Sequence, residues 1–243
     1  AGNLLANQIW RMCIDPYGTL WIGAAWSPLM RFNTNTGKCS QLKDNRGKTV
    51  FGNAVFKNQQ GNILIGTSEG LLIVNPKNLH QQLFSGNRKG NQKFLFPSIF
   101  SCYQDNRGMI WMGHEVGMTV WDTKTDSLYY FSQKEGGLCS NVVESILEGA
   151  QGKIWISTPT GISVVSRKEN QRSTFSITNY QTSDDGELYC FNANAAAEKK
   201  DGNLAFGCIG GYVSVNPNTI VNQTGHPLKV MFSQISTNGE MLD

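Results

Sequence analysis

The sequence has no long hydrophobic run and little excess of charge of either sign. It holds no window of about 18 consecutive apolar residues, so we expect no helix that crosses a membrane. The 21 basic and 18 acidic residues leave a net charge of +3, which is too small to indicate a nucleic-acid-binding protein. The N-terminal stretch AGNLLANQIW lacks a basic segment followed by an apolar one. We therefore expect a signal peptide to be absent or already removed.

Motifs for catalysis and metal binding are also missing. The six cysteines form no C-x-x-C pair and do not stand at metal-binding spacing from histidine, so they are interpreted as small buried apolar residues, and their spacing specifies no disulfide. No G-x-S-x-G sequence, phosphate-binding loop or zinc motif occurs. We expect no enzyme, no metal ion and no cofactor. A glycan lyase or hydrolase remains a weaker alternative, because Asp184, Asp185 and Glu187 form an acidic loop cluster.

Glycine, in contrast, is plentiful and recurs in a fixed pattern. A Gly is followed by one variable residue, three mostly apolar residues, usually a second Gly, and after a short loop a third Gly. The five copies begin 43, 47, 44 and 50 residues apart, at Gly18, Gly61, Gly108, Gly152 and Gly202. Short strands repeating at such a period are typical of a β-propeller with one four-stranded blade per copy.

Each copy predicts four antiparallel strands. The apolar triplet has no solvent side, so it indicates a strand buried on both faces, and Trp21, Trp111 and Trp155 within it are expected in the core. A tight turn such as Asp-Pro-Tyr-Gly precedes the triplet. The sequence predicts an all-β propeller over residues 1–227 with five visible repeats, which could close as a five-bladed ring. Its blades are expected near 9–52, 53–97, 98–141, 142–190 and 191–227. Residues 228–243 are expected to complete the last blade as its outer strand.

Antiparallel order decides where function is expected. The short turns between the first and second strands and between the third and fourth lie at one end of each blade. The loops between the second and third strands and the connections between blades lie at the other end. The second set varies most in sequence, and variable loops on a rigid scaffold usually carry recognition.

Candidate ligand-binding residues are those that break the repeat in these loops. Trp26 either stacks on a sugar ring or anchors its loop against the neighbouring blade. Glu69, His114 and Glu115 occupy the corresponding loops of the second and third copies, where they could bond hydroxyl groups. Three further candidates lie in the connections between blades and carry positive charge or an aromatic ring, namely Arg46, Arg88 and Tyr189.

The copies resemble the two-component regulator propeller repeat. The phrase D-x-x-G-x-[LI]-W-[IM]-G-[TS]-x-x-G-[LI] stands here as DPYGTLWIGA, DNRGMIWMGHEVGM and GAQGKIWISTPTGI, and more weakly as NQQGNILIGTSEGL and KKDGNLAFGCIGGY. The resemblance implies the periplasmic sensor region of a hybrid histidine kinase that detects oligosaccharides. It also implies that the five copies are part of a seven-bladed propeller, as the alternative to a five-bladed ring. Residues 228–243 would then begin a following β-sandwich, as the alternative to the outer strand of the last blade. The resemblance further implies a homodimer formed through the full-length sensor, and attachment to the membrane only through parts outside these residues. The alternative is a protein-interaction scaffold that uses the same face.

Overall fold

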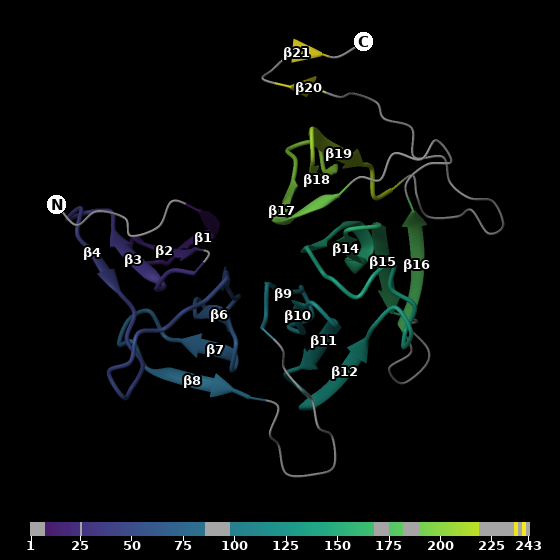
Figure 1. Cartoon of the computed structure of the whole chain (residues 1–243). Coiled ribbons are helices and arrows are strands. Elements are labelled where there is room, and N and C mark those ends of the chain that lie inside the picture. The colour runs from purple at the N-terminus through teal and green to yellow at the C-terminus, as the bar shows by residue number, and fades with distance from the viewer. Residues whose placement is uncertain are drawn as a thin grey trace. The chain divides into compact units, whose positions relative to one another are not determined.

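The computed structural model describes residues 8–24, 26–85, 98–167, 175–181, 190–218, 236–237 and 240–241. Within these ranges the regular structure is β-strand, apart from the single 3-10 turn η1 at Ala150–Gly152. The main strands form five successive antiparallel sheets, which are the blades of a β-propeller (Figure 1). The expected all-β fold with four-stranded blades is thereby confirmed. Three strands of the fifth blade are described, and most of its expected outer strand lies outside the described residues.

The chain divides into two compact units, residues 1–104 and 105–243. The first holds blades one and two and the first strand of blade three. Its strands are β1 (Ile9–Ile14), β2 (Thr19–Ala24), β3 (Met30–Asn33), β4 (Cys39–Gln41), β5 (Ala54–Lys57), β6 (Ile63–Thr67), β7 (Gly70–Val74), β8 (Gln81–Phe84) and β9 (Ser101–Gln104).

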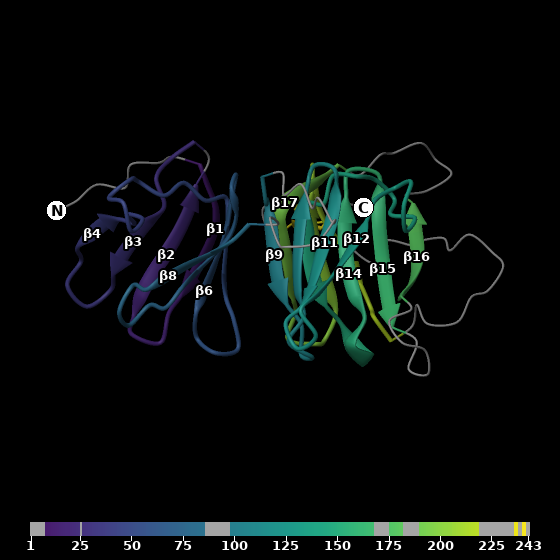
Figure 2. The same ribbon diagram turned by 90° about the horizontal axis from the view of Figure 1, so that it is seen from below.

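The second unit continues with the remaining strands, which are β10 (Ile110–His114), β11 (Gly117–Asp122), β12 (Ser127–Phe131), β13 (Ser145–Glu148), β14 (Ile154–Thr158), β15 (Gly161–Arg167), β16 (Phe175–Gln181), β17 (Phe191–Glu198), β18 (Leu204–Cys208) and β19 (Gly211–Val215). Several of them, such as β11, β14 and β15, run along nearly the same axis in the view turned by 90° (Figure 2). The two-residue strands β20 (Ser236–Thr237) and β21 (Glu240–Met241) pair only with each other.

The Asp that opens the first turn of the repeat acts as a clasp. In blade one, one carboxylate oxygen of Asp15 accepts two backbone N–H bonds of the turn, at 2.8 and 2.9 Å. Its other oxygen accepts the indole N–H of Trp21 at 2.8 Å. Asp105 forms the same three bonds in blade three, including one of 2.9 Å from Trp111. Bonds to a carboxylate are stronger than neutral ones, so the clasp fixes the turn to the buried second strand.

Blade four has lost this clasp. Gly149 stands at the Asp position, and the buried indole nitrogen of Trp155 has no hydrogen-bond partner. The indole lies so close to the turn that a Cβ atom on Gly149 would be 2.6 Å from its nitrogen. The ring therefore occupies the space that an Asp side chain would need.

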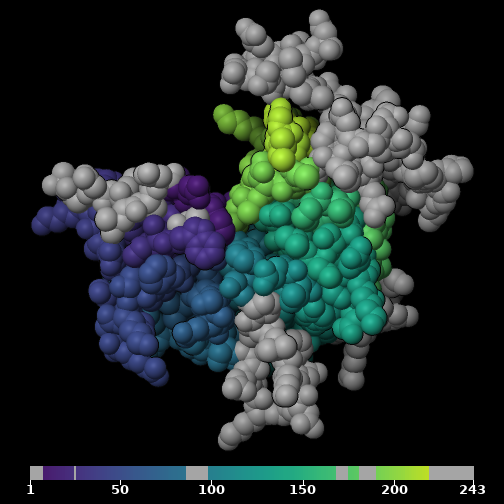
Figure 3. All heavy atoms as spheres, viewed as in Figure 1, coloured from purple at the N-terminus to yellow at the C-terminus, as the bar shows by residue number. Residues whose placement is uncertain are grey.

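Neighbouring blades pack through the apolar triplet. Trp21 of blade one forms one core cluster with Ile63 and Ile65 of blade two. In the second unit Trp155 of blade four forms another with Phe206 of blade five. The side chains of this second unit are closely packed on the face drawn in the space-filling view, where they appear in teal and green (Figure 3). All three tryptophans of the repeat are at most 2 % exposed, which confirms that they belong to the core.

Two glycines of the repeat are needed where backbones approach closely. A Cβ atom on Gly66, the second Gly of its copy, would lie 2.6 Å from the carbonyl oxygen of Ile99. Gly117, the third Gly of its copy, has φ +140 and lies against the carbonyl oxygen of Phe131 on the adjacent strand β12. Only glycine fits both the space and the backbone angle there.

Candidate functional site

We call the end of each blade that carries the second-to-third-strand loop and the connections between blades its loop end, and the opposite end its turn end. In blades two to five the loop is only two residues long, because the strands extend further than the sequence pattern indicates. In blade one it runs over five residues, 25–29, from the end of β2 to the start of β3. The longest of these loops therefore carries the candidate Trp26.

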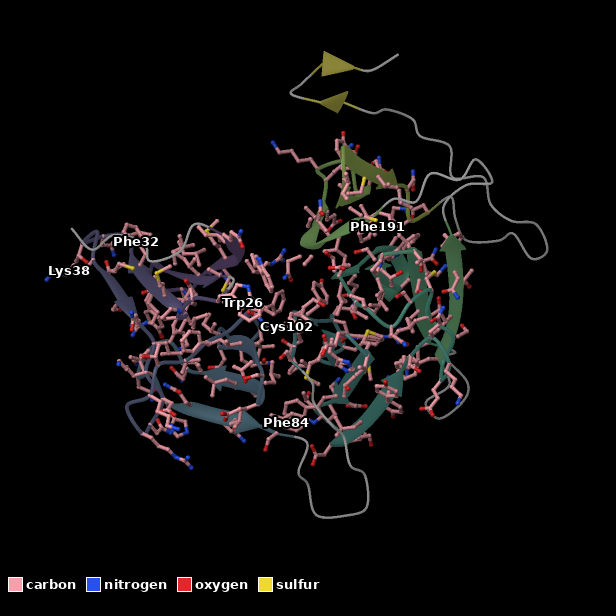
Figure 4. All side chains as sticks on the ribbon, viewed as in Figure 1. Trp26, Phe32, Lys38, Phe84, Cys102 and Phe191 are labelled. Carbon is pink, nitrogen blue, oxygen red and sulfur yellow. The ribbon has the colours of Figure 1, made fainter. Side chains whose placement is uncertain are left out.

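Trp26 is presented to solvent. Its side chain is 93 % exposed, so the alternative in which it anchors the loop against a neighbouring blade is wrong. Its φ is +54, a left-handed value that is unusual for a bulky residue (labelled in Figure 4). Two residues later Pro28 pairs with Phe51, which is itself 55 % exposed. Exposed aromatic side chains thus stand on both chain segments at this loop end.

His114 lies elsewhere than expected. It is the last residue of β10 rather than part of the loop, and its side chain is fully buried. Its ring stacks on Tyr130, with centroids 6.0 Å apart, and Nε2 lies 3.2 Å from the hydroxyl of Thr119. Burial lowers the pKa of His114 to about 4, and Nδ1 has no hydrogen-bond partner. A residue so placed cannot meet a ligand from solvent without a local rearrangement.

The repeat explains why this position points inward. Thr67 in blade two and Thr158 in blade four occupy the same place, and both are buried. Their hydroxyls donate to the carbonyl oxygens of Gly70 and Gly161, at 2.8 and 2.9 Å, and so close the short loop. Histidine replaces this hydroxyl in blade three.

The remaining candidates lie in two different units. Glu69 and Arg46 are exposed in the first unit, Glu69 in the loop of blade two and Arg46 in a turn between blades one and two. The backbone N–H of Arg46 donates to Asp44 at 2.9 Å, which fixes that turn. Glu115 is exposed in the second unit. Arg88 and Tyr189 lie outside the described residues.

A second set of residues at the loop ends was missed from the sequence. Counting eight residues back from the first Gly of each copy reaches the start of the first strand in blades one to four and a position inside β17 in blade five, and we call these five residues the start residues. They are partly buried and chemically varied, namely Trp10, Asn53, Phe100, Glu144 and Asn194. This position precedes the Gly of each copy and lies outside the segment that recurs, so the repeat pattern carries no signal for it.

In the second unit the start residues are polar. The backbone N–H of Asn194 donates to the carbonyl oxygen of Glu144 at 2.8 Å. Asn194 has φ +56 and lies where the register between β17 and β18 shifts. Burial raises the pKa of the Glu144 carboxyl above its usual value. Bulges of this kind re-aim side chains and are frequent beside binding sites.

The described residues offer neither a metal site nor, at Cys13 and Cys102, a reactive thiol. No group of three His, Cys, Asp or Glu side chains among the described residues is placed to hold a metal ion. All six cysteines are unpaired, and burial raises the pKa of Cys13 and of Cys102 to about 12, so both remain neutral thiols. No described helix is long and apolar enough to cross a membrane.

The fold places the chain among the β-propellers, built here from repeated blades whose loops differ in sequence from one blade to the next. Within that class, the family described as "Two component regulator propeller" matches residues 3–26 and 137–160. The resemblance indicated by the Gly pattern is thereby confirmed. No curated protein matches the sequence.

Solved structures support the same fold. The extracellular domain of a hybrid two-component system from B. thetaiotaomicron aligns with 23 % identity and a TM-score of 0.67, over 87 % of this chain and 28 % of that one. A second such domain from this organism aligns with 15 % identity and a TM-score of 0.69, over 94 % and 29 %. This chain thus spans less than a third of their length. A virginiamycin B lyase from Staphylococcus aureus aligns with 12 % identity and a TM-score of 0.65, over 94 % and 74 %.

Proposed function

We propose that this chain is a ligand-binding part of the periplasmic sensor region of a two-component signalling protein, and that its ligand is an oligosaccharide. The match to the two-component regulator propeller supports the sensor role. The observation that carries the ligand class is Trp26, an indole that is 93 % exposed on a backbone angle it does not favour. Strain of this kind persists mainly where function needs it.

The chemistry of the loop end suits a saccharide. Pyranose rings have partly apolar faces that stack on aromatic side chains, and Trp26 and Phe51 expose such side chains on neighbouring segments. Glu69 and Arg46 add exposed charged groups in the same unit, which can bond hydroxyl or acidic substituents. A bound ligand shifts a sensor only by its differential affinity for two states. We propose that those states differ in the packing of paired sensor chains.

The decisive experiment is a calorimetric titration of this chain with a panel of oligosaccharides. We expect at least one to bind, and Trp26→Ala to weaken its binding about tenfold or more. Tyr17→Ala is the matched control, because Tyr17 is an aromatic residue of the same blade that is 53 % exposed at the turn end. It should leave the affinity unchanged.

Other outcomes would replace the proposal. If the folded chain binds no oligosaccharide, the proposal that it senses glycans is refuted. New reducing or unsaturated ends after incubation would indicate a glycan hydrolase or lyase. Specific capture of one protein, lost in Trp26→Ala, would indicate an interaction scaffold instead.

A further inference from the structure

We propose a second aromatic binding site in the first unit, formed by the start residues Trp10, Asn53 and Phe100, which takes one neutral pyranose ring. The inference rests on the proposed function, because it deepens the identity of the ligand. It concerns residues other than those that the loop pattern singles out, and it can fail while the sensor role stands.

The three residues meet because of their register. Each stands at the start of a first strand, and β5 contacts both β1 and β9. The rings of Trp10 and Phe100 have centroids 6.2 Å apart and planes inclined by 57°. Asn53 precedes β5, and its backbone N–H is held by the carbonyl oxygen of Gly66 at 3.0 Å. Two tilted rings and one amide therefore share the loop end of the three first strands.

Trp10 is released from the sheet at this point. The register between β1 and β2 shifts between Ile9 and Arg11, which leaves Trp10 as the bulged residue. A bulge frees a residue from the regular alternation of the strand and re-aims its side chain. Neither Trp10 nor Phe100 belongs to the core cluster that Trp21 forms between blades one and two.

The polar groups at this place are unused. Among the described residues, the indole N–H of Trp10 and the side-chain amide of Asn53 have no hydrogen-bond partner. An amide offers two donors and an acceptor, and an indole offers one donor. A pyranose presents hydroxyl groups around its edge and C–H groups on its face. The aromatic faces match the C–H groups, and the free amide and indole N–H match the hydroxyls. No charged group belongs to this set, so the site is suited to a neutral sugar.

The test follows the indole N–H signal of Trp10 by ¹H–¹⁵N NMR. The signal is assigned by its loss in Trp10→Phe. The full chain is titrated with methyl glycosides of glucose, galactose and mannose at millimolar concentration, and with the best oligosaccharide of the calorimetric panel. We expect the Trp10 signal to move on addition of at least one sugar. We expect Trp10→Ala or Asn53→Ala to weaken that binding about tenfold, with Tyr17→Ala without effect.

Each other result overturns the proposal in a recognisable way. If an oligosaccharide binds but the Trp10 signal stays in place and Trp10→Ala binds normally, this site is wrong and the sensor role survives. If no sugar binds by calorimetry, both fail together. A Trp10 response to free tryptophan or to nucleosides, but not to sugars, would keep the binding site and overturn its ligand class. Unchanged thermal midpoints in Trp10→Ala and Asn53→Ala exclude misfolding as the cause of lost binding.

Discussion

Replacing Trp26 by glycine should stabilise the protein while weakening its ligand binding. A residue other than glycine in the left-handed region costs about 1–3 kcal/mol of strain, which glycine removes. Because the side chain is 93 % exposed, the lost burial is small. For an indole that buries about 150–250 Å² when fully enclosed, it amounts to about 0.4 kcal/mol at most.

Glycine also adds freedom to the unfolded chain, at a cost of about 0.5–1 kcal/mol. The balance favours Trp26→Gly by about 1 kcal/mol. For a chain of this size we expect the thermal midpoint to rise by about 2–4 °C in differential scanning calorimetry. The repeat already uses this solution, since Gly210 stands at the same place in blade five with φ +89.

Trp26→Ala separates the two effects. It removes the indole but keeps a Cβ atom at a left-handed angle, so its thermal midpoint should stay close to that of the parent. The expected order of stability is glycine above tryptophan and alanine, and both variants should bind oligosaccharide about tenfold more weakly. A fall of several degrees in Trp26→Gly would show that the indole packs, and would refute the reasoning.

Three further predictions concern the scaffold. Asp105→Asn should lower the free energy of unfolding by about 2 kcal/mol in urea titration, because the buried indole N–H of Trp111 loses its acceptor. Gly149→Ala should cost about 1–3 kcal/mol by the same assay, because its Cβ atom meets the ring of Trp155. His114→Thr should remove a pH dependence of the free energy of unfolding. Below pH 6.5 the histidine of the unfolded chain takes up a proton, whereas the folded His114 accepts one only near pH 4. The parent should therefore lose about 2 kcal/mol of its free energy of unfolding between pH 8 and pH 5.

Controls for the first and the third of these predictions come from the chain itself. Asn58 stands at the clasp position of blade two, where the partner residue is Leu64 and no indole needs an acceptor. Asn58→Ala should therefore cost less than Asp105→Asn, and an equal cost would argue against the clasp. The carboxyl groups of Glu144 and Glu148 have pKa values raised by burial and oppose the histidine effect. They are shared by parent and His114→Thr, so equal pH slopes in the two proteins would contradict the prediction.

The fold was predictable because the repeat states it five times. Gly, the turn chemistry and the apolar triplet recur in register, so the strands, the tight turns and the buried Trp21, Trp111 and Trp155 all follow from local patterns. The sequence pattern did not show whether His114 belongs to the loop or to the end of β10. If the strand is one residue longer than the pattern indicates, a side chain expected in the loop becomes a buried strand side chain. The neighbouring copies held the signal, because a closing Thr stands at that place in two of them.

The candidate site was predictable only in part. Trp26 stood out as a break in the repeat, but its 93 % exposure depends on how a five-residue loop folds. Trp10 and Phe100 are 90 residues apart in sequence, and their contact arises from the packing of first strands. Contacts of this kind come from tertiary structure and leave no mark in local spacing.

The Asp clasp has a mechanical consequence. It ties the turn end of blades one and three to a buried indole, so each of these blades is stiff along its length. A pull on the loop end cannot be absorbed by bending within such a blade, because close-packed interiors yield little. We expect each of these blades to move as one body, so a ligand that displaces the loop end of the blade would displace its turn end as well.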